Sequence, residues 1–411
     1  MNGNTAAASA GKQMYTSAFV LYLSYFVHGI GASLLGQQAI KEFLSGQWGA
    51  GIEQVTLVAA ALGLGRLITL PISGPVSDRV GRRPCSLIGV VLYALFFVGI
   101  ACSPNMQVAY AAAILGGAAN SFLDTGVIPA CVEIMEPRSG LATMLTKLFI
   151  SAAQLLLPFM LGAAAAAGLP YSAVMYGSAA AIIAIGLLVL KVPLPQKEAD
   201  EDGKKESFLQ SLKKARFTKE SVALILIGFT CTATFQLWLN CAQTFGKEVA
   251  GMADPGSMQT YYSAGTILAI FVTAILVNRF KQVRFLFIYP AVSLIMLVGV
   301  YLMRSPVICM IGAFVIGYSA AGGVLQLATA TVNDLFPKIR GTITSIIMIA
   351  SSLSNYTILS LAGSLGASKG AASVVMLNII ITAVGVLLAL FVNMRYGRMV
   401  QAAETEKGGR V

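Results

Sequence analysis

Twelve long apolar stretches constrain what this chain can fold into more than any other feature of its sequence. Each is long enough to cross a bilayer as a helix, for which about 20 residues suffice. In lipid, a helix also satisfies every backbone N–H and C=O group within the segment. The sequence therefore predicts an all-α membrane protein with twelve transmembrane helices, at 14–44, 52–78, 84–103, 106–134, 141–167, 170–190, 220–246, 257–278, 285–303, 306–334, 340–366 and 370–394.

The composition agrees with lipid rather than water as the solvent. Charged residues make up 11% of the 411 residues, and the mean hydropathy is +0.78. Soluble globular domains carry about 25% charged residues. A soluble fold with one core of this size would have too little polar surface.

The positive charges indicate how the predicted helices are oriented. All but six of the 28 Lys and Arg residues lie on one side of the membrane if the N-terminus is cytoplasmic. The six exceptions are Lys41, Lys247, Arg304 and Lys369 on the other side, and Arg66 and Lys147 within spans. Cytoplasmic loops carry an excess of Lys and Arg, so both termini are predicted to be cytoplasmic. The net charge of +11 could suggest a nucleic-acid partner. Its distribution indicates instead an inner (plasma) membrane protein in a lipid bilayer, with no nucleic acid as partner.

The chain is predicted to consist of two halves. The longest hydrophilic stretch, 195–219, separates six spans from six. We therefore expect an N-terminal six-helix bundle at 1–194, a cytoplasmic linker at 195–219 and a C-terminal six-helix bundle at 220–411.

Three sequence matches indicate that the halves are duplicated. The acid, Gly and Thr of 133–143 recur 201 positions later in 334–344. Asp78-Arg79 matches Asn278-Arg279, and Lys41-Glu42 matches Lys247-Glu248. Two related bundles with a substrate site between them are the layout of alternating-access transporters, for which we expect a monomer.

The loop after the second span carries the most specific motif. It reads Gly74-Pro-Val-Ser-Asp78-Arg79-Val-Gly81-Arg82-Arg83, which resembles the G-x-x-x-D-R-x-G-R-R signature of the major facilitator superfamily. Gly74 is expected to allow close helix packing and Gly81 a tight turn. The resemblance implies that Asp78 accepts hydrogen bonds at the N-terminus of the eleventh helix, near Gly341.

Ion pairs near this motif are expected to hold the cytoplasmic side closed in one state of the cycle. Arg82 or Arg83 is predicted to pair with Glu133, and Arg279 with Asp334. The alternative is that these arginines only anchor the topology. The predicted gating residues are Gly74, Asp78, Arg79, Gly81, Arg82, Arg83, Glu133, Arg279 and Asp334.

Ionisable residues in the middle of spans are the strongest candidates for a substrate site. Each costs about 2.5–3.5 kcal/mol on insertion scales, so each suggests a function. Arg66, Asp124 and Lys147 lie at similar predicted depths in the first half, together with the single histidine, His28. Two bases and one acid leave a net charge of +1, which favours a small organic anion as substrate.

Each of these residues also has a structural interpretation. Arg66 and Asp124 could neutralise each other, Lys147 could extend towards the cytoplasm, and His28 could be a packing residue. Asp124 is our candidate for the proton carrier. Removal from water favours a protonated carboxyl and a nearby guanidinium an ionised one, so the sequence leaves both states open.

The second half offers amides and aromatic residues instead of charge. Gln236, Asn240 and Gln243 share one helical face, with Trp238 off that face. In the resembled superfamily the first, fourth, seventh and tenth helices line the cavity. The remaining candidates for substrate contacts are Gln326, Asn355 and Tyr356. Amides are also ordinary contacts between membrane helices.

The sequence is compatible with three functions. The first is a proton-coupled carrier of a sugar acid or another carboxylate. The second is a proton–sugar symporter, because Leu123-Asp124-Thr125 followed by Pro129 is similar to a helix 4 signature of fucose–proton symporters, although Gly36 stands where those carry a second acid. The third is drug efflux, which ranks last because Pro158 lacks the glycines of that signature. We find no nucleotide-binding loop, metal cluster or nucleophile–base pair in the sequence, so we expect that the protein is not an enzyme and binds no cofactor or metal. Its expected partners are a small-molecule substrate and protons.

Overall fold

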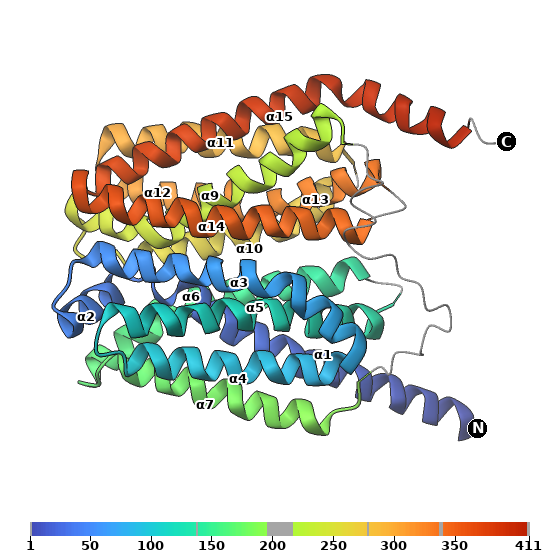
Figure 1. The fold of residues 1–411 in the computed structure, drawn as a ribbon, viewed down its shortest axis with the longest axis horizontal. Coiled ribbons are helices and arrows are strands. Elements are labelled where there is room, and N and C mark those ends of the chain that lie inside the picture. Colours follow the sequence, from blue (N-terminus) through green and yellow to red (C-terminus); the bar gives the residue numbers. More distant parts are fainter. Residues whose placement is uncertain (1, 137–138, 195–216, 278, 337–339, 409–411) are drawn as a thin grey trace. The chain divides into compact units, whose positions relative to one another are not determined.

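The computed structural model describes residues 2–136, 139–194, 217–277, 279–336 and 340–408 (Figure 1). Side chains at 2–13, 139–140, 277, 334, 340–342 and 396–408 are not described. The chain divides into unit 1, Met1–Glu201, and unit 2, Asp202–Val411. This boundary falls inside the predicted linker 195–219, most of which lies outside the described residues.

Unit 1 is built from helices that run side by side (Figure 1). Helix α3 packs on α5, α5 on α4, α4 on α7, and α1 on α6. Asn105 caps α5, because its side chain accepts a hydrogen bond from the Val108 N–H at 3.0 Å. The helices are α1 (Asn2–Leu34), α2 (Gln38–Trp48), α3 (Ile52–Val80), α4 (Arg82–Ala101), α5 (Met106–Ile134), α6 (Ser139–Ala166) and α7 (Ser172–Lys191).

Unit 2 is helical as well. Thr218 and Ser221 form a reciprocal capping box at the start of its first helix. The elements are α9 (Lys219–Glu248), α10 (Ser257–Val277), α11 (Gln282–Met303), α12 (Pro306–Ile316), the π-helical turn η1 (Gly317–Ala321), α13 (Val324–Leu335), α14 (Arg340–Lys369) and α15 (Ala371–Gly408).

The predicted fold class is confirmed. Within the described residues, twelve helical segments are long and apolar enough to cross a membrane. Large apolar side chains also face outwards: Ile295 is 73% exposed and Leu387 66% exposed. A surface of this kind is stable against lipid and not against water.

The first predicted span, 14–44, was too long. The spanning helix ends at Leu34, and Leu35 and Gly36 form a turn before the separate helix α2. The apolar pattern misled the prediction, because Ile40 and Leu44 continue it and are fully buried on α2. The matched lysines differ in their surroundings: Lys41 is buried on the separate helix α2, whereas Lys247 lies in the last turn of the continuous helix α9.

The tenth predicted span, 306–334, is present but interrupted. Its helix α12 passes into one π-helical turn, and the chain resumes as α13 after Gly322 and Gly323. Gly323 has φ +128°, a conformation that residues with a side chain rarely adopt. Helix α5, the matching span of unit 1, is continuous.

Close backbone contacts at glycines repeat between the two units. They are further evidence for the internal duplication, in addition to the sequence motifs. In unit 1, a side chain on Gly65 would strike the carbonyl oxygen of Ile114, and one on Gly117 that of Leu62. In unit 2, Gly265 and Gly317 stand in the same relation to Phe314 and Tyr262. All four positions match at an offset of 200, so the same helix pair is packed in the same way in both units.

We predict that Gly117→Ala destabilises unit 1 by about 1–3 kcal/mol, because the added methyl group separates α3 from α5. The measurement is thermal unfolding of the purified protein in detergent. Gly162→Ala on α6 is the control, since a side chain there meets no atom within 4 Å. Equal melting temperatures for the two variants would contradict the packing argument.

Candidate functional site

An ion pair joins two helices in the middle of unit 1. Arg66 Nη2 on α3 donates to Asp124 Oδ2 on α5 at 2.7 Å. Both side chains are about a quarter exposed, at 26% and 24%. The glycine contact described above positions the pair, because a Cβ at Gly117 would lie 2.7 Å from the Arg66 backbone nitrogen. The structure thus pairs the two residues, as one of the sequence interpretations proposed.

A tyrosine completes the coordination of the carboxylate. The Tyr25 hydroxyl on α1 donates to Asp124 Oδ1 at 2.7 Å, and Tyr25 is only 1% exposed. Both oxygens of Asp124 therefore accept short hydrogen bonds, one from a cation and one from a neutral donor.

His28 belongs to a second chain of hydrogen bonds beside this pair. Its Nδ1 atom lies 2.6 Å from the hydroxyl oxygen of Tyr93 on α4. The same hydroxyl donates to Oδ1 of Asn120 on α5. The His28 ring also contacts Tyr25, with ring centroids 5.5 Å apart. His28 therefore lies between the two tyrosines, in contact with both hydrogen-bond chains.

Lys147 reaches the same region from α6. Helices α1 and α6 approach closely at Gly29, where a Cβ would lie 2.9 Å from the Ala153 Cβ. Lys147, Arg66 and Asp124 all act electrostatically on the His28 ring. Arg66, Asp124 and His28 therefore lie in one region of unit 1, with Lys147 within electrostatic range of the His28 ring.

Tyr25, Tyr93 and Asn120 were not among the predicted site residues. Two of them carried a usable signal. Tyr25 precedes His28 by three positions and Asn120 precedes Asp124 by four, so each shares a helix face with a predicted residue. Tyr93 had no such signal, because its role depends on how α4 packs against α1 and α5.

The loop motif forms a compact cluster at one end of unit 1. Gly81 makes the predicted turn, with φ +95°. Arg82 Nη2 lies 3.3 Å from Glu133 Oε1, which is the predicted pair, and its Nη1 lies 3.6 Å from Asp78 Oδ1. It also donates to Ser77 Oγ at 2.9 Å. Arg82, only 13% exposed, is thus the centre of this cluster.

The other gating candidates have varied surroundings. Gly74 makes no close approach within unit 1, since a Cβ there meets no atom within 4 Å, so the close packing expected of it stays a prediction. Arg83 donates to the Val192 carbonyl at the end of α7 at 2.7 Å. Arg79 and Arg279 are exposed. The side chain of Asp334 lies outside the described set, and with it the expected Arg279 pair.

In unit 2 the predicted polar residues are partly bonded to one another. Asn240 Nδ2 donates to the Gln236 carbonyl at 2.9 Å and to its Oε1 at 3.1 Å. Gln243 is buried on the same helix, and Tyr356 is half-buried on α14. Within the described residues, Gln326 Oε1 and Asn355 Oδ1 are buried and accept no hydrogen bond.

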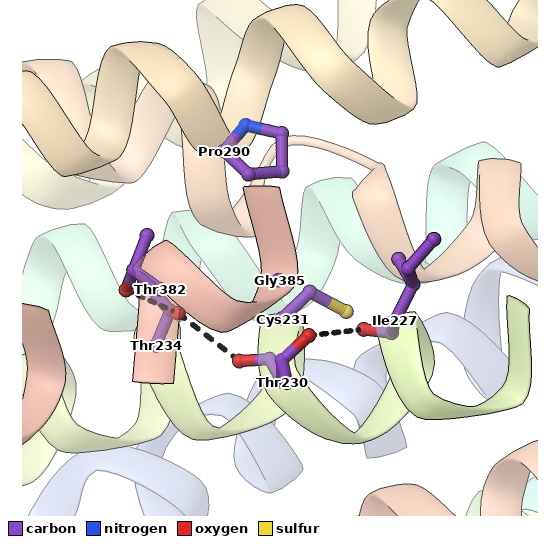
Figure 2. Close-up of a pocket in the computed structure, with 7 residues that line it drawn as sticks. All are labelled: Ile227, Thr230, Cys231, Thr234, Pro290, Thr382 and Gly385. Atoms are coloured by element: carbon purple, nitrogen blue, oxygen red, sulfur yellow. Dashed lines mark hydrogen bonds between the residues drawn. The ribbon is translucent and has the colours of Figure 1, made fainter. Parts of the chain in front are cut away.

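A small pocket in unit 2 does not form a substrate site. Figure 2 shows Thr230 and Thr234 of α9 facing Thr382 of α15, with Pro290 of α11 opposite. Thr234 bonds to the Thr230 carbonyl at 3.0 Å and to the Thr382 hydroxyl at 2.8 Å. The space holds about one water molecule. These hydroxyls therefore connect helices rather than bind a solute.

Comparison of the sequence with known proteins gives a consistent result. The Major Facilitator Superfamily model matches residues 21–354 and 242–410. The uncharacterized MFS-type transporter YfkL of Bacillus subtilis (strain 168) is 34% identical over 390 residues, covering 93% of this chain and 97% of that protein. The inner membrane transport protein YdiN of Escherichia coli (strain K12) is 31% identical over 396 residues, covering 94% and 93%.

Two further similarities are more limited. The multidrug transporter MdfA of Shigella boydii serotype 4 (strain Sb227) is 29% identical over 243 residues, covering 56% of this chain and 57% of that protein. The inward-open structure of the xylose transporter XylE from E. coli has a TM-score of 0.71 at 17% identity, covering 92% of this chain and 95% of that one. The latter similarity concerns the fold alone.

Proposed function

This chain belongs to the major facilitator superfamily, and we propose that it is a proton-coupled carrier of a small organic anion, such as a sugar acid or another carboxylate. It is a multi-pass membrane transporter and not an enzyme. The proposal concerns its substrate class, its coupling and the residues that carry them.

The observation that supports an anion is the charge balance around Asp124. Arg66 and Lys147 supply two positive charges and Asp124 one negative charge, within spans that are otherwise apolar. A net positive charge in a low-dielectric site attracts an anion. The planar guanidinium of Arg66 can bind a carboxylate through two hydrogen bonds, and Lys147 acts as a point charge.

Competition for Arg66 supplies a coupling mechanism. In this structure Asp124 holds Arg66. A proton on Asp124 removes the charge that holds the guanidinium, so Arg66 becomes available to the carboxylate of the substrate. By linkage, a bound anion then favours the protonated Asp124 to the same extent. Proton and anion bind together, as symport requires.

The remaining parts of the proposal follow the superfamily and the charge pattern. Alternating access is the transport mode of duplicated six-helix bundles, and we propose that Asp78, Arg82 and Glu133 control closure on the cytoplasmic side. The excess of Lys and Arg in the predicted cytoplasmic segments supports cytoplasmic termini in an inner membrane. We propose a monomer, with Gln236, Asn240, Gln243, Gln326, Asn355 and Tyr356 as further substrate contacts.

Drug efflux is the second candidate. The partial match to a multidrug transporter favours it, although that match covers 56% of the chain. A proton–sugar symporter remains the third candidate, supported by the helix 4 resemblance around Asp124.

Uptake by proteoliposomes separates these candidates. We expect accumulation of carboxylates or sugar acids when the lumen is more alkaline than the outside, and none without the pH gradient. Protein-free liposomes provide the background. Accumulation of neutral sugars alone, or proton-driven extrusion of lipophilic cations alone, would replace the proposal with one of the two alternatives.

Asp124→Asn is expected to separate binding from coupling. The amide cannot take up a proton and no longer holds Arg66 by charge, so anion exchange across the membrane should persist while proton-driven accumulation falls to the equilibrium level. Counterflow and pH-driven uptake are measured on the same liposomes. Glu136→Gln, an exposed carboxyl just beyond α5, is the control, and undiminished accumulation by Asp124→Asn would remove the proton role.

Asp78→Asn is expected to impair transport without destabilising the fold. The Asp78 side chain is 41% exposed and 3.6 Å from Arg82, and a long ion pair with a solvent-exposed carboxylate contributes only about 0–1 kcal/mol. Melting temperature and initial uptake rate are compared for this variant and for Glu136→Gln. Normal uptake by Asp78→Asn would contradict the gating role and would mean that the motif only anchors the topology.

A further inference from the structure

The hydrogen-bond chain through Tyr93 determines which nitrogen of His28 carries hydrogen. The Tyr93 hydroxyl has one hydrogen, and it donates this hydrogen to Asn120 Oδ1, which can only accept. The Tyr93 oxygen must therefore accept at its second contact, the 2.6 Å approach to His28 Nδ1. Nδ1 then carries the hydrogen of the neutral ring, and Nε2 is left with a free lone pair.

In the part of the chain that the structure describes, the His28 hydrogen bond of ordinary distance and angle is made by Nδ1, and Nε2 makes none of that geometry. Asn120 also acts on the ring as a hydrogen-bond partner, and the half-buried ring keeps some exposure. The charged and titratable groups around the ring are Tyr25 on α1, Arg66 on α3, Tyr93 on α4, Asp124 on α5 and Lys147 on α6. A hydrogen-bond acceptor on this ring therefore lies within electrostatic range of Arg66 and Lys147, the two cations that would bind a carboxylate.

We propose that His28 Nε2 accepts a hydrogen bond from a hydroxyl group of the transported anion, so that the substrate is a hydroxy acid. This inference rests on the proposed anion transport and narrows it. Arg66 and Lys147 bind the carboxylate, and His28 recognises the hydroxyl group by accepting its hydrogen bond. Tyr93 and Asn120 are positioning residues, because they act on the substrate only through the tautomer of His28.

The expected discrimination follows from the value of one hydrogen bond. A hydrogen bond between neutral groups contributes about 0.5–1.5 kcal/mol, and the upper end corresponds to about tenfold in affinity. An acid with the hydroxyl should therefore bind about tenfold more tightly than the same acid without it. Lactate against propionate, and malate against succinate, are matched pairs for this comparison.

The tautomer can be read directly, because His28 is the only histidine of the chain. We would label the full-length protein with ¹⁵N-histidine, purify it without a histidine tag and record the ring nitrogens by NMR. The wild type should carry hydrogen on Nδ1. Asn120→Leu frees the Tyr93 hydrogen for donation to Nδ1, so the ring hydrogen should move to Nε2. Tyr261→Phe, an exposed tyrosine of unit 2, is the control and should leave the spectrum unchanged.

The substrate contact is tested on the same samples. Lactate should shift the Nε2 resonance more than propionate does, and the ratio of their affinities should fall from about ten towards one in Tyr93→Phe and Asn120→Leu. A wild type with hydrogen on Nε2, or equal effects of the two acids, would overturn the inference. Equal transport of lactate and propionate would leave the proposed function intact, whereas transport of no carboxylate or sugar acid by the wild type would overturn both.

Discussion

The close approach of α3 and α5 is the constraint on which the site depends. Their backbones meet at Gly65 and Gly117, where any side chain would strike a carbonyl oxygen of the neighbouring helix. This contact places Arg66 within 2.7 Å of Asp124. Either charge alone would cost about 2.5–3.5 kcal/mol in a span, so the pairing that the packing provides allows both residues to be present. The packing at these two glycines thus determines where the Arg66–Asp124 pair can lie in unit 1.

Unit 2 keeps this packing without the charge. Gly265 and Gly317 repeat the glycine contact, yet Thr266 and Val324 occupy the positions that correspond to Arg66 and Asp124. Thr266 donates to the Gly317 carbonyl at 3.1 Å, at a helix interrupted by a π-helical turn and Gly323. Interruptions of this kind are frequent at functional sites. The duplication has therefore preserved the geometry of the helix pair while charge is confined to one copy.

The sequence predicted those features that depend on composition and local pattern. The number of spans, the fold class, the turn at Gly81 and the Arg82–Glu133 pair follow from apolar length, a specific motif and opposite charges near one loop. The end of the first span was missed because the buried face of α2, with Ile40 and Leu44, continues the apolar pattern beyond Gly36. Tyr93 was missed because its partners come from α1 and α5, and no spacing within α4 indicates them. The break at Gly323 was missed because a glycine inside an apolar span also fits a continuous helix.

The two partners of Asp124 respond differently to a proton, and this difference makes the site suitable for coupling. Arg66 can only donate, so its bond to the carboxyl weakens when Asp124 loses its charge. The Tyr25 hydroxyl can donate to a carboxylate and accept from a protonated carboxyl, so its bond survives in either state. Protonation therefore releases the guanidinium while the carboxyl stays anchored to α1 through Tyr25. In the proposed mechanism, an anion that enters at that moment would find Arg66 available in an otherwise unchanged site. One hydroxyl and one guanidinium on the same carboxylate would then link the two proposed binding events.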